Sequence, residues 1–152
     1  MMANVELEKA TQFKLYQWHK SSGVLLLLAF ILRLVLRLLI RPPALPEVLS
    51  GAQQRMTKIG HWAMYGLMLA MPLTGWLMVS ASVYGLPTIV FNWFEWPHIP
   101  NVQGEKHIEE RANTAHFVLA ILFFSAIVGH IGAVIWHRKY DGIRLIKRMW
   151  WS

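Results

Sequence analysis

Three histidines lie within, or at the edge of, long apolar stretches of this chain: His19, His116 and His130. His116 and His130 are 14 residues apart. On an α-helix this spacing is about 21 Å along the axis and returns to nearly the same face. In a hydrocarbon core about 30 Å thick, one imidazole therefore lies toward each leaflet. Ionisable side chains at such depth are costly and usually belong to a functional site. We interpret these histidines as axial ligands of two haems, because neutral imidazole binds haem iron well.

His19 and His116 are the predicted ligands of one haem. The first and third apolar segments run in the same direction across the membrane, so both histidines lie toward the outer ends of their helices. From there they could bind one iron from opposite faces. Two imidazoles fill both axial positions, which favours electron transfer over oxygen binding. For any single membrane histidine, a hydrogen bond to a neighbouring helix is the more common arrangement.

A partner for His130 at the inner end is not evident from the residues. His137 lies on nearly the same face of the same helix, and one helix cannot bind both faces of a porphyrin. His61, on the second apolar segment, could reach the iron only if that segment faces the site, and an interfacial hydrogen bond is its more common role. Arg33 shares a face with His19, so its guanidinium could pair with a haem propionate or extend to the lipid headgroups.

Composition places the chain among membrane proteins. Of its 152 residues, 55% are hydrophobic and only 15% are charged, and the mean hydropathy is +0.37, which is unusual for a soluble protein of this size. We predict an all-α membrane bundle forming one domain, with spans at about 12–40, 57–81 and 108–137, an outer loop at 82–107, and no regular structure other than helix. The absence of cysteine excludes disulfides, thiolate metal sites and covalently attached haem.

The positive charges predict the orientation. Ten of the fifteen Lys and Arg residues lie on one side of a three-span arrangement, around the first loop and after the third span: Arg33, Arg37, Arg41, Arg55, Lys58, Arg138, Lys139, Arg144, Lys147 and Arg148. The positive-inside rule makes that side, and the C-terminus, cytoplasmic. Because these residues flank apolar spans and form no soluble basic face, the net charge of +7 indicates the lipid bilayer as partner and not nucleic acid.

Three motifs resemble one known family. They are FKLYQWHKSSG (residues 13–23), GHWAMYGLMLAMPLTGWLM (60–78), and HFVLAILFFSAIVGHIGAVIWHRKYDGIRLIKRM (116–149). Together they resemble the bacterial cytochrome b561 family, four-helix membrane proteins of the inner membrane that bind two b-type haems. The spacing of the three histidines in the last motif, followed by its D-G and R-M tail, is highly specific.

The resemblance implies a role for each histidine. In the family, the positions matching His19 and His116 ligate the outer haem. The position matching His130 pairs at the inner haem with a histidine of the family's first helix, which has no counterpart in this sequence. The position of His61 is not a ligand, and His137 corresponds to a position near the cytoplasmic haem, where the family handles quinone. The resemblance therefore implies one haem b, with the second missing, bound through His130 alone, completed by another chain, or present in a longer gene product.

The predicted function is that of a membrane b-type cytochrome. The resemblance implies electron transfer from an outer-side donor, which is superoxide for some members, through haem to ubiquinone. The alternatives are a cytochrome subunit of a dehydrogenase or hydrogenase complex, and a non-catalytic membrane anchor without cofactor. A divalent-metal carrier is disfavoured because the spans lack accompanying carboxylates. A homodimer is a further hypothesis, because three helices around a haem leave one flank exposed.

Overall fold

The computed structural model describes residues 2–40 and 51–140, with the side chains of residues 2–7, 137 and 140 outside the description. Each of its helices contains an apolar stretch long enough to cross a membrane: Glu8–Leu39, Gly51–Ala81 and Lys106–Trp136. These stretches confirm the predicted all-α membrane bundle with three spanning helices. The elements in chain order are α1 (Met2–Leu39), α2 (Gly51–Ala81), β1 (Thr88–Val90), β2 (Phe94–Trp96) and α3 (Lys106–Tyr140).

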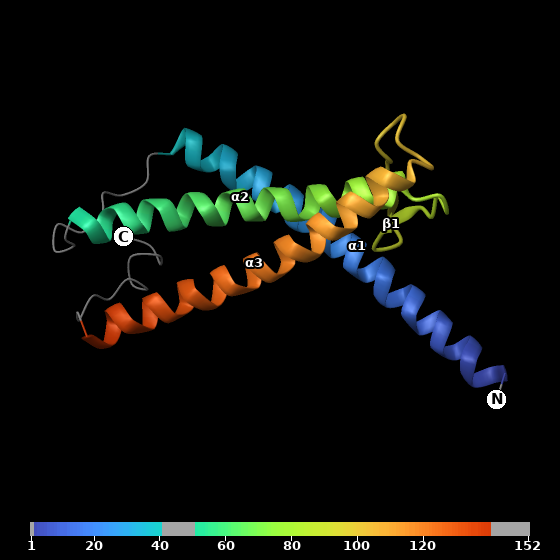
Figure 1. The fold of residues 1–152 in the computed structure, drawn as a ribbon, viewed down its shortest axis with the longest axis horizontal. Helices are drawn as coiled ribbons and strands as arrows, with labels where there is room; N and C mark the ends of the chain where they lie inside the picture. Colours follow the sequence, from blue (N-terminus) through green and yellow to red (C-terminus); the bar gives the residue numbers. More distant parts are fainter. Residues whose placement is uncertain (1, 41–50, 141–152) are drawn as a thin grey trace.

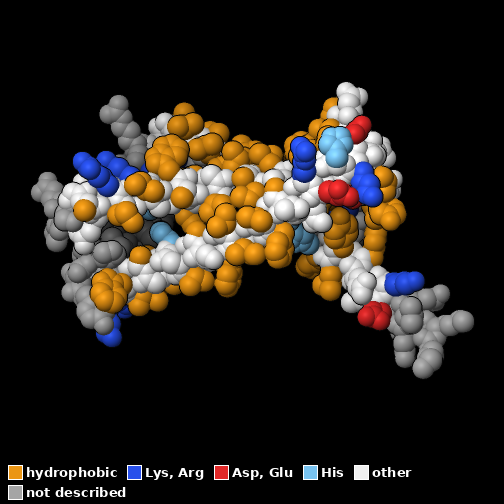
Figure 2. Space-filling view, in the orientation of Figure 1, with side chains coloured by type: hydrophobic (Ala, Val, Ile, Leu, Met, Phe, Trp, Pro, Cys, Tyr) orange, Lys and Arg blue, Asp and Glu red, His pale blue; other side chains and the backbone are white. Residues whose placement is uncertain are grey.

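The helices run alternately up and down, so α1 and α3 share one direction and α2 opposes them (Figure 1). α2 and α3 form the main helix pair, and α1 packs against α2 and β1. The ribbons of α2 and α3 lie close at the end that carries the β strands and separate toward the other end (Figure 1). Between the ends, apolar side chains cover much of the visible surface, while Lys, Arg, Asp and Glu gather at the two ends (Figure 2). The protein therefore presents a lipid-contacting belt between two polar rims.

The loop between α2 and α3 corrects one prediction. We expected no regular structure other than helix, but β1 and β2 pair antiparallel, with Val90 opposite Phe94. The turn places Phe91 and Asn92 at positive φ, 46° and 63°, a conformation that Asn tolerates better than most residues. The strands are rich in β-branched and aromatic residues, which favour extended backbone. Two strands of three residues each give too short an alternation to stand out beside the long spans.

This hairpin is fastened to α1 by side chains of one short stretch. Lys20 Nζ donates to the Pro87 carbonyl at 2.7 Å, and Ser21 Oγ donates to the Ile89 carbonyl at 3.1 Å. The backbone N–H of Phe91 in turn donates to Ser21 Oγ at 3.1 Å. Lys20 and Ser21 are both buried. Because they follow His19 directly, these bonds set the depth of His19 relative to the other helices.

Candidate functional site

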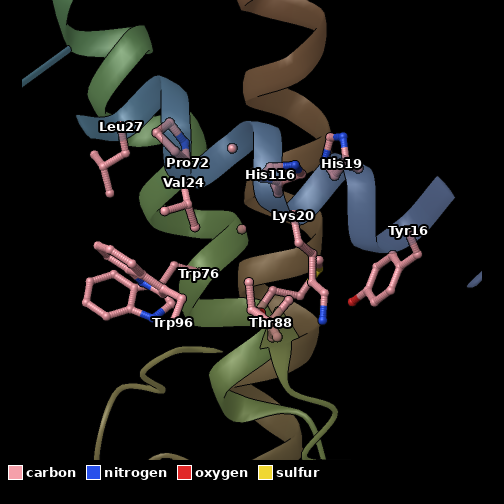
Figure 3. Close-up of a pocket in the computed structure, with 14 residues that line it drawn as sticks. Tyr16, His19, Lys20, Val24, Leu27, Pro72, Trp76, Thr88, Trp96 and His116 are labelled. Carbon is pink, nitrogen blue, oxygen red and sulfur yellow. The ribbon is translucent and has the colours of Figure 1, made fainter. Parts of the chain in front are cut away.

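His19 on α1 and His116 on α3 lie next to each other at the hairpin end of the bundle (Figure 3). Their ring centroids are 6.0 Å apart and the rings are nearly perpendicular, at 88°. Two metal–nitrogen bonds of about 2 Å, together with two ring radii of roughly 1 Å, separate the centroids of two imidazoles on one ion by about 6 Å. The separation of the two rings therefore fits ligation of one iron from both faces.

The hydrogen bonds of His116 prepare one of its nitrogens for a metal. Its Nδ1 lies 3.0 Å from the Met71 carbonyl oxygen on α2 and 3.3 Å from Thr74 Oγ1. A carbonyl oxygen can only accept, so this bond requires the proton on Nδ1 and leaves the lone pair on Nε2. A histidine that ligates a metal usually donates its other N–H in this way, which holds the ring in place. His116 is thus oriented as a ligand would be.

Two glycines keep the space around the histidine pair open. A Cβ on Gly75 would lie only 3.0 Å from Cε1 of His116, whereas a Cβ on Gly23, one turn after His19, would meet nothing within 4 Å. The cavity beside the pair is lined mainly by apolar side chains of α1 and α2, with Trp96 of the hairpin (Figure 3). Such a lining suits a flat apolar macrocycle bound through a few polar contacts. The residues present here therefore fit a haem.

Gly75 provides a direct test of how tightly this site is built. In the variant Gly75→Ala, the new methyl group forces the His116 ring to move by several tenths of an ångström. We expect haem to be held about tenfold more weakly, because misplacing a ligand costs affinity much as loss of its supporting contacts does. The measurement is the rate of haem transfer to a haem-scavenging protein. Gly66→Ala is the matched control, since a Cβ there meets nothing within 4 Å, and equal rates for the two variants would contradict the expectation.

A second histidine pair lies further along the same helices. The rings of His61 on α2 and His130 on α3 have centroids 6.0 Å apart and are tilted by 54°. The antiparallel register explains the pairing: His116 lies against Gly75, and 14 residues further along α3 corresponds to 14 residues back along α2. Sequence reasoning had no partner for His130, because the facing of α2 was unknown. One known contact between α2 and α3 would have predicted it.

The remaining predicted site residues lie toward this second pair. Arg33 Nε donates to the Tyr65 hydroxyl at 3.5 Å, and the positive charges of Arg33 and Arg37 act electrostatically on His61. Arg33 is therefore close to His61 and belongs to this end of the bundle, away from the His19 and His116 rings. The side chain of His137 lies outside the described residues.

Comparison with known proteins identifies the family. A family model described as prokaryotic cytochrome b561 matches residues 1–152. Cytochrome b561 homolog 2 of Escherichia coli (strain K12) is 30% identical over 131 residues, which is 86% of this chain and 68% of that relative. The chain belongs to the prokaryotic cytochrome b561 family.

Membership in the cytochrome b561 family gives the site its chemistry. The protein is a multi-pass membrane cytochrome, and the family implies electron transfer through haem b. The imidazole donor set fits a b-type haem, which is held by axial ligands and packing without covalent attachment. Haem b, when bound, supplies the one-electron redox chemistry, while the protein positions it and excludes water from it.

Proposed function

We propose that this cytochrome b561 family member accepts electrons at the hairpin end of the bundle and delivers them to ubiquinone at the opposite end. The hairpin end is the outer side of a bacterial inner membrane, and the C-terminus is cytoplasmic. The observation that carries the proposal is the pair of His19 and His116 at 6.0 Å. It supports a haem with both axial positions filled by protein, which transfers electrons without binding a substrate at the iron.

The charge distribution supports this orientation. Arg33, Arg37, Arg55 and Lys58 lie toward the ends of α1 and α2 that are remote from the hairpin. The hairpin end carries acidic side chains, among them Glu95 and Glu105. Cationic residues collect on the cytoplasmic side of inner-membrane proteins. The His19 and His116 pair therefore belongs to the outer leaflet.

Superoxide is the proposed donor. Two superoxide anions each lose one electron and become two molecules of dioxygen. One ubiquinone takes up the two electrons and two protons and becomes ubiquinol. The chain's own contribution is to hold a haem between donor and acceptor and to keep both reactions apart from each other.

The test uses the full chain in liposomes that contain ubiquinone, with superoxide generated enzymatically outside. We expect the haem spectrum to become reduced and ubiquinol to accumulate, and His19→Ala to abolish both. His107→Ala is the matched control, because His107 is exposed and its partner is Glu105, at 3.3 Å. Haem that stays oxidised under superoxide while a chemical reductant reduces it would contradict the proposed donor. Reduced haem without ubiquinol would contradict the proposed acceptor.

A further inference from the structure

Two imidazole pairs with the same centroid separation lie along this bundle. His19 and His116 are 6.0 Å apart, and His61 and His130 are also 6.0 Å apart. The two pairs share α3, on which His116 and His130 are separated by 14 residues, or about 21 Å. The first pair is the site already described. The second pair takes its other histidine from α2, and the family pattern gives that position no ligand.

The separation in the second pair fits a shared metal better than a direct hydrogen bond. Two imidazoles joined by a hydrogen bond have nitrogens about 3 Å apart, which places the ring centroids roughly 5 Å apart. Two bonds of about 2 Å to one ion place the centroids about 6 Å apart. The measured 6.0 Å between His61 and His130 matches the second arrangement.

The donor set selects haem over a metal ion bound by protein alone. A structural metal ion in a protein usually takes about four side-chain ligands. Within the part of the chain that the structure describes, no three His, Cys, Asp or Glu side chains stand together as such a site requires. A haem supplies four nitrogens from its own ring, so two imidazoles complete the coordination of its iron.

Cationic side chains of α1 lie beside the second pair. Tyr65, one turn after His61, accepts a hydrogen bond from Arg33 Nε at 3.5 Å, and the Arg37 guanidinium lies 5.5 Å from the centre of the Tyr65 ring. Both positive charges act electrostatically on His61. A haem carries two propionates, and guanidinium pairs well with carboxylate. The charge beside the pair is thus complementary to a haem.

Space for a flat ring is present around the two histidines. Both side chains are exposed in the structure, and a Cβ on Gly60 or Gly129, their neighbours in the chain, would meet nothing within 4 Å. Figure 2 shows a hollow between α2 and α3 toward this end, with a histidine side chain visible inside it.

We infer that His61 and His130 are the two axial ligands of a second haem b, so that α3 supplies one ligand to each of two haems. The inference rests on the proposed function as a haem cytochrome. It assigns His61 a role that the family resemblance denies to its position. It also assigns Arg33 and Arg37 to the propionates of this second haem.

The test is the haem content of the full chain purified in detergent after expression with added haem precursor. We expect two haems per chain, and one haem in His61→Ala, in His130→Ala and in the double variant. Loss that is no greater in the double variant identifies the two histidines as one unit. Electron paramagnetic resonance should show two low-spin signals typical of two-imidazole ligation, of which one disappears. The matched control is His98→Ala, a histidine of the loop between the hairpin and α3, which should retain both haems.

The outcomes separate this inference from the proposed function. One haem per chain that is removed by His116→Ala and unaffected by His61→Ala would overturn the inference and leave the proposed function standing. A chain without any haem would overturn both. If His61→Ala lost both haems, added imidazole should restore one signal by taking the place of the missing ring. Failure of this rescue in protein that retains its helical circular dichroism would overturn the inference.

Discussion

Replacing His116 by alanine is expected to remove the haem of the hairpin end almost completely. The variant loses the iron–nitrogen bond and the ring held by the Met71 carbonyl at 3.0 Å. Loss of a supporting contact alone typically costs about 10- to 100-fold in metal affinity, so loss of the ligand itself costs more. The measurement is haem per protein, determined from the reduced-minus-oxidised spectrum of the purified chain.

His19→Ala should give the same loss, because the two imidazoles hold one iron. The matched control is His107→Ala, which removes an exposed histidine near the same end. Haem content in His116→Ala equal to that of the unchanged protein would exclude its assignment as a ligand. Full loss in His116→Ala with full retention in His19→Ala would instead assign the other axial position to a different residue.

Replacing Phe30 by alanine is expected to destabilise the bundle by about 3 kcal/mol. Phe30 is only 2% exposed and packs on the Tyr65 ring, with centroids 5.8 Å apart. Apolar burial drives helix association only weakly in a membrane, so close packing of this kind carries much of the stability. The variant leaves a cavity beside Tyr65, which also contacts Arg33. The measurement is the free energy of unfolding from helical circular dichroism in mixed micelles.

Phe124→Ala is the matched control for that experiment. Phe124 lies on α3 and is 70% exposed, so its side chain faces lipid and its loss leaves no cavity. We expect its unfolding free energy to stay within about 0.5 kcal/mol of the unchanged protein. Equal destabilisation by the two substitutions would show that the contact of α1 with α2 does not depend on Phe30.

Much of the fold was predictable because its signals are local. The three apolar stretches are long enough to cross a membrane, and this property depends only on composition and length. The spacing of His116 and His130 predicts one helix face at two depths, since helical periodicity needs no tertiary contact. The hairpin was missed because its strands are short, and because its hold on α1 depends on Lys20 and Ser21, which bond to residues far along the chain.

The amino-acid sequence by itself determined which segments span the membrane and at what depth each histidine lies. Only the tertiary structure decided which histidines meet: His116 with His19, and His130 with His61. The physical reason is that these spans are apolar on all sides, so no amphipathic stripe indicates which face of a helix packs against its neighbour. The rotation of α2, and with it the position of His61, follows from long-range contacts such as that between Gly75 and His116.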